Sequence, residues 1–298
     1  MQESLIDTPE ALAAFAEQLR GSEWLALDTE FIRQKTYFPQ LCLLQVSNGE
    51  QAACVDPLAL EDLSPLLEVI NDGSILKLFH AGRQDLEIFL HEWGHIPLPL
   101  FDTQIAAALL GHGDQIGYAK LVKEVLDVDL AKDQSLTDWS QRPLDDQQLR
   151  YALDDVIYLG QLFTRVRADL ADAGRLPWLA ADFAELADPA TYVQHPQTAW
   201  QRVKGRQQIR GQGLAVLQRL AAWREQEARA RDIPRKWVLR DDLMLEIARR
   251  KPVNTTVQAR IRGLEPGQIR RDGERLIEEV TAARALPPEE WPRPDDIG

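Results

Sequence analysis

Two carboxylates separated by one residue follow an apolar segment near the N-terminus, in the run LALDTEF at residues 25–31. Side chains at positions i and i+2 lie on the same face of a β-strand, so Asp28 and Glu30 would project together. Two neighbouring carboxylates repel each other unless a cation lies between them. A turn or a helix cap would account for Asp28 but would leave Glu30 unexplained. The pair therefore predicts a metal site.

Three further residues have the chemistry and spacing to complete such a site. Asp85 follows another apolar segment and falls in the first turn of a predicted helix, where acids are common because they complement the helix macrodipole. Tyr151 and Asp155 are four residues apart on a predicted helix and so share one face, whereas Asp154 would point elsewhere as a solvated neighbour. Each piece alone also has an ordinary structural explanation. Their order, a strand Asp-x-Glu, a helix Asp and a helix Tyr-x-x-x-Asp, is more specific than any one of them.

One mixed α/β sheet flanked by helices accounts for the elements that would position these residues. Apolar runs of strand length occur at 24–28, 41–47 and 52–56, with connections that favour an antiparallel meander. A further buried strand is predicted at 75–80. Helical patterns occur at 11–19, 61–70, 83–93, 102–110, 117–126 and, as one long helix, from 145 to about 173.

The pattern of the chain changes after residue 175, where periodicity weakens and prolines recur. We expect a first domain at 1–175, a connector at 176–207, a small all-α module at 208–286 and a Pro-rich acidic tail at 287–298, extended and solvated. Within the module, helical segments are predicted at 213–232, 241–250, 255–261 and 271–285. A chain of 298 residues is long enough for two such domains.

The net charge of −13 is divided unevenly along the chain. Residues 1–200 hold 13 Lys and Arg against 32 Asp and Glu, a net of −19, whereas residues 201–298 hold 21 against 15, a net of +6. An acidic half can concentrate divalent cations, and a basic half can bind phosphates with release of counterions. Acidic surfaces also simply keep proteins in solution, so charge alone does not decide between these explanations.

The sequence also argues against a membrane-spanning helix, a signal peptide and a cysteine-based site. No apolar run approaches the ~20 residues that a membrane-spanning helix needs, and residues 1–10 lack the layout of a signal peptide. We therefore expect a cytoplasmic protein without a membrane partner. Cys42 and Cys54 both lie in apolar segments, which favours buried thiols over a disulfide or a zinc site.

The motifs together resemble a known enzyme family. The segments DTEF at 28–31, HAGRQDLE at 80–87 and YALDDV at 151–156 look like the three exonuclease motifs of the DEDDy superfamily. Within it the chain resembles the bacterial ribonuclease D family, also at TYFPQL (36–41), FDTQ (101–104), TDW (137–139) and RPL (142–144). Residues from about 209 to 286 resemble the HRDC domain that follows the exonuclease domain in that family. The resemblance covers nearly the whole chain and includes one HRDC domain, whereas members of the family often carry two.

The resemblance implies an RNase H-like exonuclease domain followed by the small helical HRDC-like domain, and a metal-dependent 3′-to-5′ exoribonuclease. Two divalent cations, Mg²⁺ or Mn²⁺, would be held by four acids: Asp28 bridging both, Glu30 and Asp155 on the side of the attacking water, and Asp85 at the other ion. Tyr151 would orient that water or help to deprotonate it. The substrate would be RNA with a free 3′ end, with precursor tRNA as the expected example, and the products nucleoside 5′-monophosphates. We expect the protein to be a monomer.

Several residues near the motifs have two possible roles. Thr29 and Phe31 could contact the terminal nucleotide, although Phe31 would also suit the core. Tyr37 and Phe38 could stack on terminal bases, since such stacking tolerates any sequence, or could pack their loop onto the sheet. His80 could bind a phosphate or serve as a structural hydrogen-bonding group.

Basic clusters near predicted helix ends in the C-terminal module could meet phosphates together. Their members are Arg235, Lys236, Arg249, Arg250, Lys251, Arg270 and Arg271. A solvated surface is the alternative explanation. For the whole chain, the alternatives are a DNA-directed exonuclease that uses the same acids and a non-catalytic RNA-binding scaffold.

Overall fold

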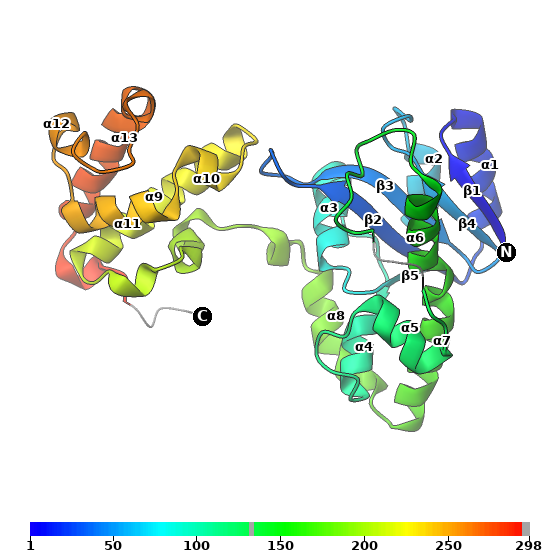
Figure 1. Ribbon diagram of the computed structural model, residues 1–298. Coiled ribbons are helices and arrows are strands. Elements are labelled where there is room, and N and C mark those ends of the chain that lie inside the picture. Colours follow the sequence, from blue (N-terminus) through cyan, green and yellow to red (C-terminus); the bar gives the residue numbers. More distant parts are fainter. Residues whose placement is uncertain (131–133, 294–298) are drawn as a thin grey trace. The chain divides into compact units, whose positions relative to one another are not determined.

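The chain folds into an α/β unit and a helical unit, shown in a computed structural model that describes residues 1–130 and 134–293 (Figure 1). Its contacts assign Met1–Ile32 and Pro39–Tyr192 to the first unit. The second unit consists of Arg33–Phe38 and the chain from Val193 onward. No helix in the described part of the chain is both long and apolar enough to cross a membrane.

The described residues of the first unit form a six-stranded mixed sheet with the strand order β1-β4-β3-β2-β5-β6. The strands are β1 (Gln2–Ile6), β2 (Trp24–Ile32), β3 (Gln40–Ser47), β4 (Gln51–Val55), β5 (Leu76–Phe79) and β6 (Leu100–Asp102). The antiparallel pairs β2–β3 and β3–β4 confirm the predicted meander, and the pairs β1–β4, β2–β5 and β5–β6 are parallel. Sequence patterns missed β1, which is almost entirely exposed, and β6, which has only three residues.

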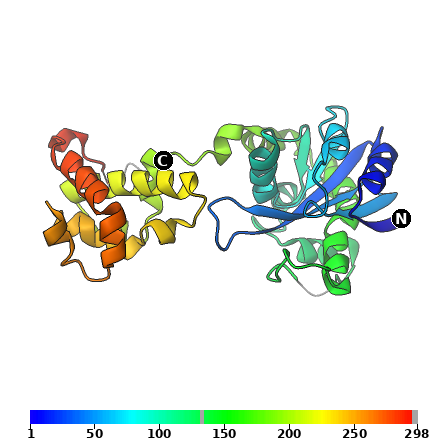
Figure 2. The ribbon, with the colours of Figure 1, turned by 90° about the horizontal axis from the view of Figure 1, so that it is seen from above.

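Helices cover both faces of this sheet (Figures 1 and 2). They are α1 (Pro9–Leu19), α2 (Ser64–Ile70), α3 (Arg83–Trp93), α4 (Thr103–Leu109), α5 (Tyr118–Leu126), α6 (Asp146–Ile157), α7 (Leu159–Asp172) and α8 (Leu179–Ala187). Leu25 and Leu27 of β2 pack in the core shared with α1, α2 and α3, whereas Ala26 packs in the core shared with α7. Because side chains alternate along a strand, Asp28 and Glu30 project on the same face as Ala26.

The long helix predicted from 145 to about 173 is interrupted at Tyr158, where α6 ends and α7 begins. The α6 helix lies against β2, β3 and β4, whereas α7 lies against β2 and β5. Adjacent strands of a sheet are rotated relative to one another, so one straight helix of this length would not follow both groups of strands. The hydrophobic spacing continues through the break, which is why the sequence predicted one helix.

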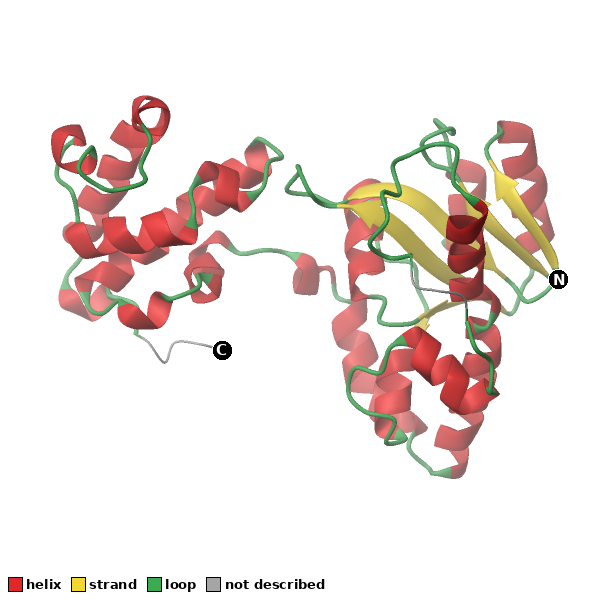
Figure 3. Ribbon diagram, in the orientation of Figure 1, coloured by secondary structure: helices red, strands yellow, loops and turns green. Residues whose placement is uncertain are grey.

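The described residues of the second unit contain helices and no strand (Figure 3). Its α-helices are α9 (Gln212–Ala230), α10 (Arg235–Val238), α11 (Asp241–Arg250), α12 (Thr255–Gln258) and α13 (Pro266–Arg284). They bury one core built around Leu217, Leu220, Met244, Leu276 and Val280. This arrangement confirms the predicted all-α module. Helix α13 begins earlier than the predicted 271, since Pro266 occupies its first turn.

Short helices occupy the segment expected as a connector, 176–207. In the first unit, η1 (Leu176–Trp178) leads into α8, whose Leu179 and Leu186 are buried in the cores of the sheet, and η2 (Pro189–Tyr192) follows it. In the second unit, η3 (Pro196–Arg202) packs Trp200 into the helical core, and η4 (Arg206–Gln208) precedes α9.

In the described part of the tail expected at 287–298, a short helix precedes a tryptophan that packs against the helical core. Residues 288–290 form the helix η5 (Pro288–Glu290), and Trp291 packs against the helical core. The Trp291 indole Nε1 donates a hydrogen bond to the carbonyl of Leu286 at 3.1 Å. The predicted extended conformation is therefore wrong for residues 288–290, which are exposed as expected, and Trp291 is partly buried rather than solvated. Residues 294–298 of the predicted tail lie outside the described residues.

Candidate metal and catalytic site

The site begins where β2 continues beyond its parallel neighbour. Strand β5 pairs only with Trp24, Leu25 and Ala26, whereas the pairing of β2 with β3 extends to Ile32. The chain turns to opposite sides of β2 to form β3 and β5. Such a reversal of strand order leaves a crevice at the carboxyl end of a strand, which is the usual ligand site of α/β sheets. Asp28 and Glu30 both lie in this part of β2.

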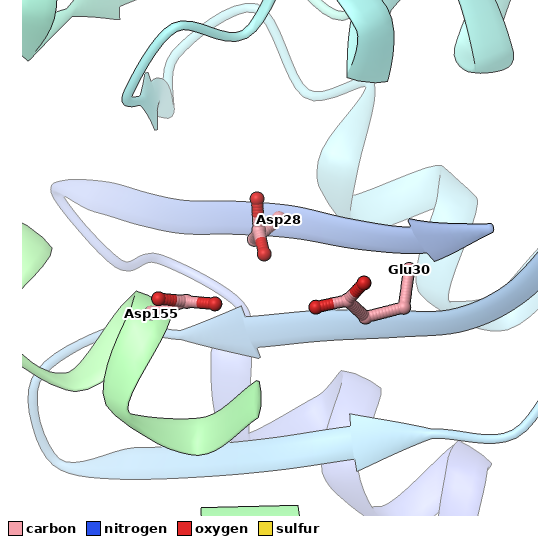
Figure 4. Close-up of side chains that lie close together, drawn as sticks. All are labelled: Asp28, Glu30 and Asp155. Carbon is pink, nitrogen blue, oxygen red and sulfur yellow. The ribbon is translucent and has the colours of Figure 1, made fainter. Parts of the chain in front are cut away.

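Three carboxylates converge in this crevice (Figure 4). Asp28 and Glu30 project from β2 and Asp155 from α6, and one oxygen of each lies within 4.8 Å of the other two. Glu30 is only 8% exposed. The sequence predicted that Asp155 joins Asp28 and Glu30, and the structure brings these three carboxylates together. Three carboxylate oxygens at this spacing form the kind of ligand set that hard divalent cations prefer.

Asp85 lies in the first turn of α3 and is held by a neighbour of the cluster. The Thr29 hydroxyl donates a hydrogen bond to Asp85 Oδ1 at 2.5 Å, and both residues are buried. The turn before α3 is fixed in turn by Asp102, whose carboxylate accepts hydrogen bonds from the backbone N–H groups of Ala81 and Gly82. Asp102 also caps α4, because its side chain accepts hydrogen bonds from the backbone N–H groups of Gln104 and Ile105.

Burial and mutual repulsion disfavour the charged forms of these acids. Burial, followed by the charges of Asp85, Asp155 and Glu30, raises the pKa of Asp28 well above its usual range. Burial also raises the pKa of Asp85 to about 7, although the hydrogen bond from Thr29 opposes this shift. A divalent cation would relieve both effects, because it supplies the opposite charge that the buried carboxylates lack. The residues present therefore fit a divalent metal.

Gln45 is a member of the site that sequence reasoning missed. It lies on β3 directly opposite Asp28, is fully buried, and its Nε2 donates a hydrogen bond to Asp28 Oδ2 at 3.3 Å. Its Oε1 has no hydrogen-bond partner among the described residues. The available signal was a single amide in the middle of the otherwise apolar run LCLLQV. A buried amide beside a metal-binding carboxylate orients that carboxylate.

Helix α6 carries Tyr151 and Asp155 and is fixed at several points. Its N-terminus has a capping box formed by Asp145 and Gln148. The Tyr118 hydroxyl donates a hydrogen bond to the backbone carbonyl of Asp154, one residue before Asp155, at 2.8 Å. The Tyr151 ring lies 6.1 Å from the ring of the buried Trp139. These contacts hold the helix at both ends of the face that carries Tyr151 and Asp155.

Asp154 differs from its predicted role as a solvated neighbour. It is buried, and its carboxylate pairs with Arg150 at 2.7 Å. The same guanidinium pairs with Glu3 of β1 at 2.9 Å. Asp154 is thus part of an ion-pair network that joins α6 to the first strand.

The loop that precedes α6 is fastened to the sheet by Arg142. Its guanidinium makes two hydrogen bonds to the Asp56 carboxylate, at 2.7 and 2.8 Å, and a third to the carbonyl of Cys42 at 2.7 Å. Paired guanidinium–carboxylate hydrogen bonds fix geometry as well as adding energy. Arg142 therefore acts in the structure rather than on a substrate.

The four predicted acids and Tyr151 line one cavity of about 360 Å³. Its lining comprises Leu27, Asp28, Thr29, Glu30, Phe31, His80, Ala81, Gln84, Asp85, Tyr118, Ser135, Tyr151, Asp155 and Leu159. Thr29 and Phe31 therefore both line the cavity of the acids. Both ring nitrogens of His80 already have partners, the Thr103 hydroxyl and the Ile116 carbonyl, each at 2.9 Å. Burial lowers the pKa of His80, and because both ring nitrogens have partners within the protein, the geometry favours the structural role.

Tyr37 and Phe38 lie elsewhere, in the second unit. Tyr37 is 5% exposed and belongs to the helical core, and its hydroxyl donates a hydrogen bond to Glu225. The ring of Phe38 is partly buried against the same core. Neither residue lines the cavity of the acids, and their loop packs on helices rather than on the sheet.

The predicted basic clusters of the helical unit are largely ion-paired. Arg235 binds Glu225 through two hydrogen bonds, at 2.6 and 2.7 Å. Arg249 and Arg250 both pair with Glu246. Arg271 pairs with Asp272. For Lys236, Lys251 and Arg270, the structure shows no ion pair among the described residues, and Lys236 and Arg270 are exposed.

Comparison with known proteins places both units in described families. Residues 4–171 match a 3′-5′ exonuclease family and residues 213–280 match the HRDC domain. The chain is 44% identical to ribonuclease D of Zymomonas mobilis over 295 residues, which cover 98% of this chain and 75% of that protein. It also matches the crystal structure of Escherichia coli RNase D, described as an exoribonuclease involved in structured RNA processing, with a TM-score of 0.87 and 39% identity over 99% of this chain and 78% of that one. A structure of Brucella melitensis NrnC with bound Mg²⁺ matches with a TM-score of 0.55 and 29% identity, covering 67% of this chain and 95% of that one.

Proposed function

Because the chain belongs to the ribonuclease D family of 3′-to-5′ exoribonucleases, we propose that it trims the 3′ ends of precursor tRNA and other small structured RNAs at a two-metal site. The observation that carries this proposal is the convergence of Asp28, Glu30 and Asp155 within 4.8 Å. Asp85 and Tyr151 line the same cavity. A description of the E. coli relative as an enzyme of structured RNA processing supports the substrate class.

Each acid has a distinct task in this proposal. The charges of Asp85, Asp155 and Glu30 all raise the pKa of Asp28. This central position suits a ligand shared by two ions. Glu30 and Asp155 would help to hold the cation on the side of the attacking water. Asp85 would help to hold the other cation. When bound, Mg²⁺ or Mn²⁺ would supply the positive charge that activates this water and stabilises the leaving 3′ oxygen. The Mg²⁺ bound by B. melitensis NrnC makes magnesium the first cation to test.

Tyr151 would orient the attacking water through its phenol oxygen, or help to remove its proton. The Tyr151→Phe variant keeps the ring that faces Trp139 and loses only the hydroxyl. We expect kcat to fall by ~10²-fold, within the range for a positioned proton-transfer group, with little change in KM or in Mg²⁺ affinity. Steady-state kinetics and calorimetric titration with Mg²⁺ would measure these quantities. A loss of Mg²⁺ affinity in the variant would instead assign Tyr151 to the metal site.

Substrate choice is tested with matched polymers. A 3′-extended tRNA, a single-stranded RNA of the extension sequence and a DNA of the same sequence are incubated with the protein and Mg²⁺. We expect nucleoside 5′-monophosphates from both RNAs, with trimming of the tRNA stopping near the mature end. Faster digestion of the DNA would overturn the RNA assignment while leaving the metal chemistry intact.

A further inference from the structure

Most polar side chains that line the cavity of the acids are already engaged within the protein. The hydroxyl of Thr29 donates a hydrogen bond to Asp85, and both ring nitrogens of His80 have partners. The Tyr118 hydroxyl donates to the backbone carbonyl of Asp154. The carboxylates of the cavity belong to the proposed metal site. These groups hold the site together, so recognition of a sugar or a base needs a further side chain.

Gln84 is such a side chain. It precedes Asp85 in the first turn of α3, is exposed, and lines the same cavity. Within the described part of the chain, its amide makes no hydrogen bond. An amide carries both a donor and an acceptor, so it can bind a hydroxyl group in either direction. Gln84 is therefore free to form a hydrogen bond with a substrate in this cavity.

The position of Gln84 beside Asp85 indicates which part of a substrate it would meet. In the proposed function, the cation near Asp85 stabilises the leaving 3′ oxygen. That oxygen belongs to the penultimate nucleotide, which becomes the new 3′ end. The 2′-hydroxyl of the same ribose is attached to the neighbouring carbon atom. A side chain that follows Asp85 into the same cavity would therefore lie close to this hydroxyl during the reaction.

The cation next to Gln84 in the sequence is paired within the protein. Arg83 is exposed, and its guanidinium lies 3.3 Å from the carboxylate of Glu185 in α8. Phosphates are bound most strongly by charged donors, whereas a neutral amide matches a ribose hydroxyl. A hydroxyl is therefore the group that Gln84 fits best.

We propose that Gln84 binds the 2′-hydroxyl of the penultimate ribose and thereby favours RNA over DNA. The amide oxygen would accept a hydrogen bond from the hydroxyl, or the amide N–H would donate one to it. The 2′-hydroxyl is the group by which a protein distinguishes RNA from DNA at a given position. This inference rests on the proposed function, and it assigns part of the choice of substrate to one side chain.

The test uses the full chain with Mg²⁺ and three RNA trinucleotides. One is unmodified, one has a 2′-deoxyribose at the penultimate nucleotide, and one has a 2′-deoxyribose at the 3′-terminal nucleotide. Initial rates of release of the terminal nucleotide give kcat/KM for each. The variant Gln84→Met removes the amide and keeps an unbranched side chain of similar length. The matched control is Gln18→Met, which makes the same change at an exposed position of α1 outside the cavity.

The informative quantity is the ratio of kcat/KM for the unmodified substrate to kcat/KM for the penultimate-deoxy substrate. A ratio is needed because removal of the hydroxyl also makes the 3′ oxygen a poorer leaving group. We expect Gln84→Met to lower this ratio by ~5-fold, the scale of one neutral hydrogen bond, and Gln18→Met to leave it at the wild-type value. The corresponding ratio for the terminal-deoxy substrate and the affinity for Mg²⁺ should be the same in Gln84→Met and in the wild type.

A penultimate-deoxy ratio that is equal in Gln84→Met and in the wild type would overturn the proposal. This includes the case in which the variant cleaves all three substrates more slowly by one factor, because the amide would then contact a base or a phosphate. An equal fall of the ratio in Gln18→Met would also overturn it. If the wild-type protein releases no 5′-monophosphate from the unmodified trinucleotide, the proposed catalytic function is itself contradicted, and this inference with it.

Discussion

The carboxyl group of Asp28 is buried among other acids and also accepts hydrogen bonds from its neighbours. Burial and the charges of three other acids raise its pKa, whereas the side-chain amide of Gln45 and the backbone N–H of Thr29 donate hydrogen bonds to it. Such an arrangement is costly without a cation and favourable with one. We therefore expect the affinity of the site for metal to depend on Gln45 and on pH.

Replacing Gln45 with Leu removes the donor to Asp28 Oδ2 while keeping a side chain of similar size. We expect Mg²⁺ affinity, measured by calorimetric titration, to fall by ~10- to 100-fold, as is usual when a group that orients a metal ligand is lost. Gln40→Leu, at the exposed start of the same strand, is the matched control and should bind Mg²⁺ normally. Equal affinities in the two variants would show that Gln45 does not position Asp28.

The pKa of Asp85 predicts how metal and pH act together on stability. Its folded value, about 7, lies above the ordinary value of 3.8, so folding favours the protonated form. This stabilisation is fully present below pH 3.8 and is lost as pH rises through about 7. The metal-free protein should therefore gain more from Mg²⁺ at pH 8 than at pH 5. Melting temperatures with Mg²⁺ and with chelator at both values measure this difference, and a shift independent of pH would contradict the assignment.

At the scale of elements, the turn between β5 and α3 decides where Asp85 lies. Gly82 is the N-cap of α3, and a Cβ added there would lie 2.5 Å from the Cβ of Phe79. Real Cβ atoms do not approach a neighbour so closely, so any larger residue must displace the start of the helix. The glycine therefore allows the close packing that, together with the hydrogen bonds to Asp102 and from Thr29, places Asp85.

The Gly82→Ala variant tests this role of the turn. We expect the free energy of unfolding to fall by about 1–3 kcal/mol, the usual cost of overpacking, and kcat to fall because Asp85 moves with the helix. Gly73→Ala is the matched control, since a Cβ there meets no atom within 4 Å. Chemical denaturation and steady-state kinetics measure both effects. Normal activity in Gly82→Ala would show that the site tolerates movement of α3.

Elements with a strong local signal were predictable from the sequence, and those that depend on distant partners were not. The meander and α3 follow from apolar spacing, whereas β1 exists because its backbone pairs with β4. The acids were found because their order along the chain is specific. Gln45 was missed because its importance comes only from lying opposite Asp28 across the sheet. From the sequence, Tyr37 could stack on a base or pack its loop onto the sheet, and only tertiary packing reveals its place in the helical core.

At the scale of the whole molecule, charge is divided according to task. The first 200 residues hold the acids that would bind metal, and the last 98 carry a net charge of +6 that suits an RNA partner. Because phosphate contacts release counterions, binding of long RNA should weaken steeply with salt. Hydrolysis of a dinucleotide, which reaches few cations, should respond much less. The two activities can therefore be measured separately.

In the proposed function, Asp28, Glu30, Asp85 and Asp155 hold the divalent cations with which the protein hydrolyses RNA from its 3′ end. The most direct measurement is release of nucleoside 5′-monophosphates from a 3′-extended tRNA with Mg²⁺, with Mg²⁺ and excess chelator, and by the Asp28→Asn variant with Mg²⁺. We expect release only in the first case, and the Asp28→Asn variant should still bind the tRNA. Release that survives both the chelator and the substitution would contradict it.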